Sequence, residues 1–215
     1  VMRAAAENLT PVTLELGGKT PAIIDASAKL KDAAAAITYG KLLNGGQTCI
    51  APDYVLVEPN HLDALIEELQ ASAQLQFSNP EELTGPIDDE QLQRWQHLVA
   101  DALDRGAKAI GLLNNPTAGA RRFEPVALIN VPPEARVLHE EIFGPILPIV
   151  VINNLSAAID YVNSKANPLA LYWFGKDKKN LQRVLDETRS GGVTINDTLL
   201  HAAVDSLPFG GVGAS

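Results

Sequence analysis

The chain has 215 residues, of which 46% are hydrophobic and 20% charged, and its net charge is −9. This composition suits one globular domain or two small ones, and the acidic balance, with no basic run beyond residues 176–179, argues against a nucleic-acid partner. No apolar stretch reaches the roughly 18 residues that cross a bilayer, and the N-terminus lacks the apolar segment of a signal peptide, so we expect a cytoplasmic protein with no membrane partner.

Apolar runs bounded by glycine, proline or polar residues predict strands, and longer stretches with helical spacing predict helices. We expect strands at residues 12–16, 21–25, 54–57, 107–113, 125–129, 146–152, 169–174 and 192–195. We expect helices at residues 30–43, 62–75, 88–103, 156–164 and 180–189, and loops at residues 84–87 and 114–122. Strand and helix alternate through most of the chain, which is typical of βαβ crossovers. The predicted fold class is therefore α/β, with a mainly parallel sheet covered by helices.

Cys49 is the only cysteine, which excludes an internal disulfide framework and a multi-cysteine zinc site. It follows two glycines, Gly45 and Gly46, at the end of a predicted helix, and Pro52 comes shortly after it. A helix that ends there leaves Cys49 on a loop among free backbone N–H groups, a position suited to a reactive thiol. A free cysteine also commonly fills space in a core, and position alone leaves both interpretations open.

Acidic residues precede two glycine-containing turns. Glu15 comes two residues before Gly17 and Gly18, which permit close approach of a ligand or another backbone. Glu141 lies next to Glu140 and near Phe143. Carboxylates can hold a hydroxylated ligand, and an aromatic ring can stack on a flat one. Taken singly, these features also fit a solvent-facing glutamate on an edge strand and a charged turn.

The histidines and the C-terminal glycines give weaker indications of a functional site than Cys49 and the glutamates do. The four histidines are scattered, so neither a metal site nor a Cys–His pair stands out, and only His201 lies near glycine-rich loops where it could line a pocket. The glycine-rich stretch at residues 191–213 lacks the strand–GxGxxG–helix arrangement that binds phosphate, because no helix is predicted after it.

Four segments together resemble the successive signatures of the aldehyde dehydrogenase superfamily. They are residues 14–21 (LELGGKTP), 46–49 (GQTC), 140–145 (EEIFGP) and 208–211 (PFGG), in the family's order. The resemblance covers essentially the whole chain. Residues 50–54 and 196–209 look most like the class 3-like branch, which includes fatty, aromatic and coniferyl aldehyde dehydrogenases.

The resemblance implies a reaction and a role for each candidate residue. The Cys49 thiolate would attack the aldehyde carbonyl to give a thiohemiacetal, and hydride would pass to NAD or NADP to leave a thioester. Glu15, if partly desolvated, would activate the water that hydrolyses this thioester. Glu141 would bind the nicotinamide ribose and Phe143 would pack beside the nicotinamide ring. We therefore expect Cys49 within reach of Glu15, with Glu141 and Phe143 lining the same cleft.

The implied function is the oxidation of an aldehyde, aromatic such as coniferyl aldehyde or aliphatic, to the carboxylic acid. We expect residues 1–215 to form one thiol-bearing catalytic domain of a larger, homodimeric enzyme, because the chain starts in a helix already under way and stops within a glycine-rich turn. The family's dinucleotide-binding domain would lie mostly upstream of Glu15, so the chain alone should be inactive or nearly so. Two alternatives stay open: a cofactor-independent thiol esterase that uses Cys49 and Glu15, and a non-catalytic module with an incidental cysteine.

Overall fold

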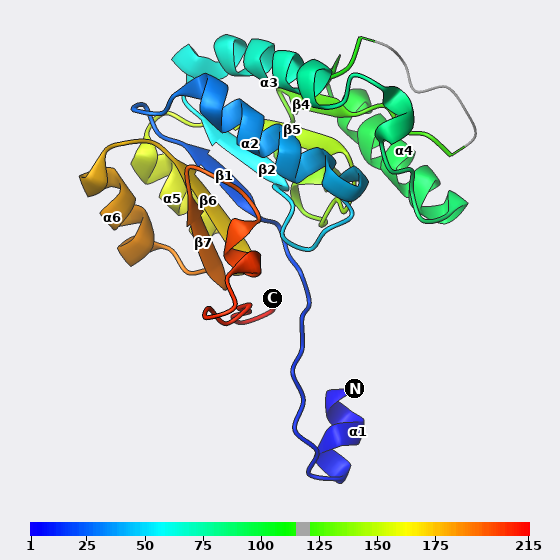
Figure 1. Ribbon diagram of the computed structural model, residues 1–215, viewed down its shortest axis with the longest axis vertical. Coiled ribbons are helices and arrows are strands. Elements are labelled where there is room, and N and C mark those ends of the chain that lie inside the picture. The colour runs from blue at the N-terminus through cyan, green and yellow to red at the C-terminus, as the bar shows by residue number, and fades with distance from the viewer. Residues whose placement is uncertain (115–120) are drawn as a thin grey trace.

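A seven-stranded sheet forms the centre of the computed structural model, which describes residues 1–114 and 121–215 (Figure 1). Its strands are β1 Pro21–Ile24, β2 Tyr54–Val57, β3 Lys108–Gly111, β4 Val126–Ile129, β5 Ile146–Val151, β6 Ala170–Phe174 and β7 Gly192–Ile195. Their order is β3-β4-β5-β2-β1-β6-β7, and only β3 pairs in the antiparallel sense. The predicted α/β class with a mainly parallel sheet is confirmed.

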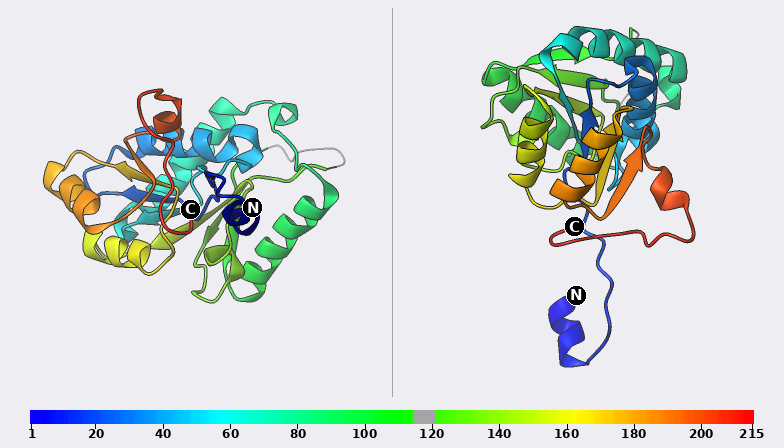
Figure 2. Two further views of the ribbon diagram at one scale, coloured as in Figure 1. Left: turned by 90° about the horizontal axis from the view of Figure 1, so that it is seen from below. Right: turned by 90° about the vertical axis from the view of Figure 1, so that its left-hand side faces the viewer.

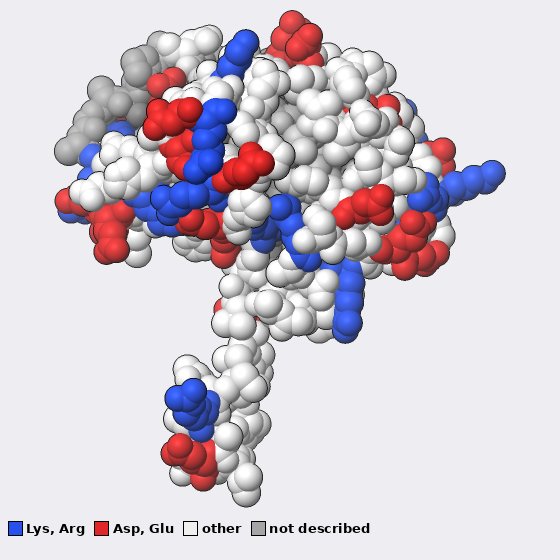
Figure 3. Space-filling view, turned by 180° about the vertical axis from the view of Figure 1, so that it is seen from behind, with Lys and Arg blue, Asp and Glu red and all other residues white. Residues whose placement is uncertain are grey.

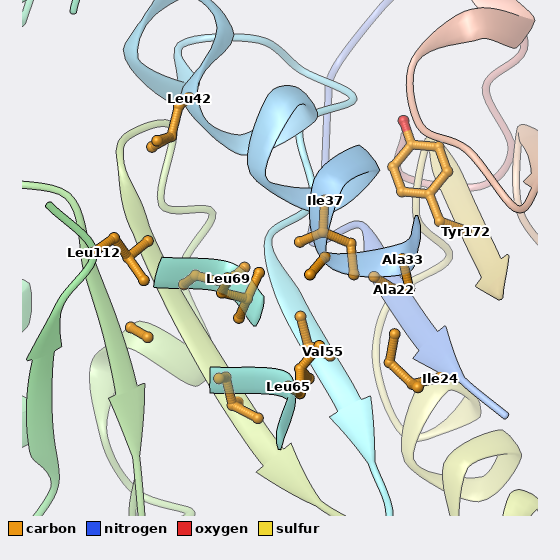
Figure 4. Packing of buried hydrophobic residues seen from close by; sticks show 14 of the residues in the cluster. Ala22, Ile24, Ala33, Ile37, Leu42, Val55, Leu65, Leu69, Leu112 and Tyr172 are labelled. Atoms are coloured by element: carbon orange, nitrogen blue, oxygen red, sulfur yellow. The ribbon is translucent and has the colours of Figure 1, made fainter. Parts of the chain in front are cut away.

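Helices cover both faces of this sheet (Figures 1 and 2). One face carries α2 Leu30–Leu42 and α3 Leu62–Gln76, and the other carries α4 Asp89–Asp104, α5 Leu155–Asn163 and α6 Lys178–Glu187. Ala22 and Ile24 of β1 therefore pack toward α2 (Figure 4), whereas Ile23 between them packs in the cluster of α5 and α6. Burial on both faces explains why the central strands are continuous apolar runs.

Polar caps fix where three of the helices begin. Asp88 accepts a hydrogen bond from the backbone N–H of Gln91 at the start of α4, and Asn154 does the same for Ala157 in α5. Asp177 caps α6. Such caps satisfy backbone donors that have no partner inside the helix. These elements and the paired strands agree with the predicted bounds to within about two residues.

The first residues of the chain stand away from this body. Helix α1 Met2–Glu7 buries no residue, and the turn that ends it carries the almost fully exposed Leu9, after which the chain is extended (Figures 1 and 2). Figure 3 shows that this projecting segment carries few charges, whereas acidic and basic side chains are interspersed on the body above it. No helix in residues 1–114 and 121–215 is long and apolar enough to span a bilayer.

The predicted strand at residues 12–16 is wrong. This segment is extended, as its alternating residues suggested, but it has no strand assignment and pairs with no described strand, and Leu16 is 56% exposed. Alternation favours an extended backbone, but a strand also needs a neighbour to pair with its N–H and C=O groups. Of the predicted loop at 114–122, residues 115–120 lie outside the described residues.

Candidate active site

The turn that precedes Cys49 is formed by three consecutive residues with positive φ. After α2, Asn44, Gly45 and Gly46 have φ of 53°, 63° and 74°, which reverses the chain. A Cβ on Gly46 would lie 2.5 Å from the carbonyl oxygen of Gly144, so only glycine permits this approach. The turn of residues 44–46 and the segment before β5 are therefore packed backbone against backbone.

Cys49 lies just beyond residues 44–46, on the turn of residues 48–51, where it is half-buried and packs against the core beneath α2. Burial raises the pKa of its thiol, and the backbone N–H groups of Cys49 and Ile50 act in the opposite direction. The charges of Glu141 and Glu15 raise this pKa further. The expected N–H groups are present, but burial outweighs them.

Glu15 lies on the projecting N-terminal segment, and its side chain is exposed. The expected partial desolvation of this carboxylate is therefore not observed. Leu14 and Leu16, on either side of Glu15, border a hollow together with residues 210–213 of the C-terminal segment, whereas the Glu15 side chain stays exposed.

Glu141 is half-buried against the glycines of residues 17–18. A Cβ on Gly17, whose φ is 74°, would come within 2.8 Å of both carboxylate oxygens, so the carboxylate occupies the space that a side chain would need. Burial raises the pKa of Glu141, while the backbone N–H of Gly18 and the charge of Lys19 partly oppose this rise. A partly desolvated acceptor of this kind suits a ligand that donates hydrogen bonds.

A buried ion pair between Lys19 and Asp53 holds the segment that leads to Glu141. The Lys19 ammonium also donates to the carbonyl oxygens of Val137 and Glu140, each at 2.9 Å. The second Asp53 oxygen accepts the backbone N–H of Ile142 at 2.9 Å. One pair thus connects the glycine turn, the start of β2 and both sides of Glu141. The sequence interpretation missed both residues.

Helix α4 holds the next residues of the same segment. Gln91 and Trp95 both donate to the carbonyl oxygen of Phe143, at 3.0 Å and 3.1 Å, and Arg94 donates to that of Ile142 at 2.7 Å. These bonds keep Phe143 at a φ of 48°, which is unusual for a bulky side chain, and the residue is 39% exposed. An exposed ring on a fixed backbone is available for stacking.

Lys41, near the end of α2, is a second group that the sequence did not single out. It is fully buried, and burial lowers its pKa to about 8, while the nearby charges of Asp53 and Glu141 oppose the change. The site therefore combines two lysines, Lys19 and Lys41, with two buried or half-buried carboxylates.

A cleft of about 460 Å³ opens beside Glu141. Cys49, Glu15 and Phe143 are not among its lining residues, so only Glu141 of the four predicted site residues borders this hollow. Its walls come from the glycine turn, the segment before Glu141, the turn after α5 and the C-terminus, with Leu16, Gly17, Gly18, Lys19, Leu138, His139, Glu141, Ser164, Lys165, Ala166, Asn167 and Ala214.

Comparison with known proteins gives consistent matches. Residues 1–215 match the model of the aldehyde dehydrogenase family. The chain is 50% identical over 218 residues to a probable coniferyl aldehyde dehydrogenase of Pseudomonas aeruginosa, which covers 100% of this chain and 45% of that protein. It is 40% identical over 223 residues to an aldehyde dehydrogenase of Rattus norvegicus described as dimeric and NADP-preferring, covering 100% of this chain and 47% of that protein.

Solved structures show the same fold. The substrate-bound AldH of Staphylococcus aureus superposes with a TM-score of 0.91 at 39% identity, covering 100% of this chain and 47% of that one. The chain therefore spans less than half the length of the curated relatives and solved structures that it matches here.

Proposed function

The chain belongs to the aldehyde dehydrogenase family, and on this premise we propose that Cys49 is the nucleophile of an aldehyde oxidation that yields a carboxylic acid. The thiolate sulfur bonds to the carbonyl carbon, and the oxygen becomes an oxyanion in a thiohemiacetal. Departure of hydride leaves a thioester on Cys49. Water then attacks the thioester carbon, the C–S bond breaks, and the acid leaves as the thiol is restored.

The residues around Glu141 fit a nicotinamide dinucleotide, NAD or NADP, which when bound supplies the hydride acceptor. The half-buried Glu141 carboxylate borders a cleft and can accept hydrogen bonds from ribose hydroxyls. The exposed ring of Phe143 offers a flat apolar face to the nicotinamide. The NADP-preferring relative and the family's use of NAD or NADP support a nicotinamide dinucleotide here. They do not decide between NAD and NADP.

Glu15 is proposed as the base that takes a proton from the hydrolytic water. Support comes from its charge, which acts on the Cys49 sulfur, and from its place two residues before the glycine turn that contacts Glu141. An exposed carboxylate becomes a stronger base at working pH when a ligand or a further segment desolvates it.

The substrate class and the assembly are inferred from the relatives. The 50% identity to a probable coniferyl aldehyde dehydrogenase favours an aromatic aldehyde of that kind, with an aliphatic aldehyde as the second choice. The dimeric rat relative supports a homodimeric whole enzyme. The lone half-buried cysteine fits a reducing cytoplasm. In this proposal residues 1–215 supply the thiol-bearing catalytic domain, and the dinucleotide domain belongs to the part of the relatives that the chain does not span.

One observation carries the proposal: Cys49 lies just beyond a glycine-built turn with two backbone N–H groups and two carboxylates acting on its sulfur. The test is a chimera in which this chain replaces the matching 45% of the Pseudomonas aeruginosa protein. The chimera should reduce NAD or NADP with coniferyl aldehyde, and Cys49→Ala should abolish the reaction. Activity that survives Cys49→Ala in the chimera would refute the role of the thiol.

The 215-residue chain alone should show little or no aldehyde oxidation. Because it contains both Cys49 and Glu15, hydrolysis of a p-nitrophenyl ester is the second function to test on it. Release of p-nitrophenol that disappears in Cys49→Ala would favour the thiol esterase, and no release would argue against it.

A further inference from the structure

Tyr172 connects the sheet to the turn that carries Cys49. It lies on β6, is completely buried, and donates its hydroxyl hydrogen to the carbonyl oxygen of Ile50 at 2.5 Å. Figure 4 shows the ring rising from β6 beside Ile37 of α2, with the hydroxyl at its outer end. The residue that receives this bond directly follows Cys49. A side chain 122 residues from Ile50 in the sequence therefore holds the turn of residues 48–51, which carries Cys49.

The same ring is fixed from the other side by the segment after β7. The backbone N–H of Leu199 opposes the rise that burial causes in the pKa of Tyr172. The Tyr172 ring lies 6.1 Å from the ring of His201, which is buried and hydrogen-bonded to Thr194 at 2.8 Å. His201 thus lies beside the Tyr172 ring in the interior. Tyr172 is therefore enclosed, with its hydroxyl bonded to Ile50 and its ring next to His201.

We propose that Tyr172 is a positioning residue for Cys49, because its hydroxyl holds the turn of residues 48–51 in the form that directs the N–H groups of Cys49 and Ile50 toward the sulfur. This inference rests on the proposed role of Cys49 as nucleophile. The turn itself is closed by a bond from the N–H of Ala51 to the carbonyl oxygen of Thr48 at 3.0 Å, and the Tyr172 hydroxyl ties it to β6.

Loss of the hydroxyl leaves the buried carbonyl of Ile50 without its donor. An unpaired buried acceptor is unfavourable, so the turn shifts to find another partner. The two N–H groups that favour the thiolate then move away from the sulfur, while burial and the charges of Glu141 and Glu15 continue to disfavour it. The thiol of the variant should consequently ionise at higher pH than that of the unaltered chain.

The test is Tyr172→Phe, which keeps the ring and removes one oxygen. The second-order rate of Cys49 alkylation by iodoacetamide is measured on the 215-residue chain between about pH 6 and 10, because only the thiolate reacts. We expect the inflection of the pH profile to rise by about half a pH unit, which lowers the rate at pH 8 about threefold. Since the assay uses neither aldehyde nor cofactor, its result is separable from failure of the proposed oxidation.

The matched control is Tyr54→Phe. It removes the hydroxyl from a buried residue on the opposite face of the sheet, where Tyr54 packs edge-on against Tyr161. This variant should leave the alkylation profile unchanged. An unchanged or faster profile in Tyr172→Phe, or an equal shift in the control, would overturn the proposal.

A measurement on the unaltered chain tests the role of the Tyr172 hydroxyl even where a variant does not fold. The Tyr172 hydroxyl proton should exchange slowly with solvent and show a nuclear Overhauser contact to Ile50, since it is buried and donated to that carbonyl. Absence of this contact in a folded, assigned spectrum would show that the hydroxyl does not hold the turn.

Discussion

The ion pair of Lys19 and Asp53 makes a sharp prediction about the segment that carries Glu141. Asp53→Asn removes the charge and keeps the shape, so that the Lys19 ammonium stays buried without its counter-charge. The two side chains are only 10% and 4% exposed, and Asp53 also accepts the N–H of Ile142. Removing one partner of a buried pair typically costs about 3–5 kcal/mol, because the remaining charge is left uncompensated. We expect a loss at the lower end of this range, since two carbonyl oxygens still accept from Lys19.

The assay is urea unfolding of the 215-residue chain at neutral pH, followed by circular dichroism. With a slope of about 2 kcal/mol per molar urea, a loss of 3 kcal/mol lowers the midpoint by about 1.5 M. Lys19→Met and the double variant complete a cycle, in which the two single losses should sum to clearly more than the loss in the double variant. The amide of Ile142 should also exchange faster in Asp53→Asn, because its acceptor has lost its charge.

The control is Glu187→Gln, which breaks an ion pair on α6 between Arg183 and Glu187. These side chains are 42% and 44% exposed, so solvent screens the pair and the midpoint should not move measurably. A loss below about 1 kcal/mol in Asp53→Asn, or single losses that simply add in the double variant, would show that the pair does not hold the Glu141 segment.

Three further variants test the surroundings of Glu141. Trp95→Phe removes the hydrogen bond to the carbonyl of Phe143 and shrinks a fully buried side chain, so the free energy of unfolding in urea should fall by about 2–3 kcal/mol, and an unchanged value would contradict that role. Gly17→Ala should cost more than Gly106→Ala, because both have positive φ but only the first places a methyl 2.8 Å from the Glu141 oxygens; equal losses in thermal unfolding would rule this contact out. Glu141→Gln should raise the urea midpoint at neutral pH but not near pH 4. Burial raises the pKa of Glu141 in the folded chain, so the native state binds more protons than the unfolded state between the folded and unfolded pKa values. The stability of the unaltered chain therefore falls as pH rises through that window. The same gain at both pH values would exclude the charge as its cause.

The helices and paired strands were predictable because their signal is local. The apolar run of β5 and the spacing in α3 depend only on neighbouring residues, and each element lies where its pattern indicated. The segment at residues 12–16 shows the limit of this reasoning. Its alternation correctly indicated an extended chain, but whether that chain pairs depends on what lies beside it.

Candidate site residues could be found where a motif of neighbouring residues marks them, as for Cys49, Glu15, Glu141 and Phe143. The residues that support them carry no such mark. Trp95 reads as an ordinary core residue of an amphipathic helix until its indole is seen on the carbonyl of Phe143. No local signal in the sequence could have identified this contact.

Residue order alone was enough to establish the α/β class, the succession of elements and the lone thiol at a glycine turn, since each depends on short-range pattern and backbone preference. Folding in three dimensions decided the strand order, the antiparallel β3, the exposure of Glu15 and the bonds from Lys19 and Tyr172. These features join groups far apart along the chain, and their energies depend on burial and distance, which exist only once the sheet and its helices have packed.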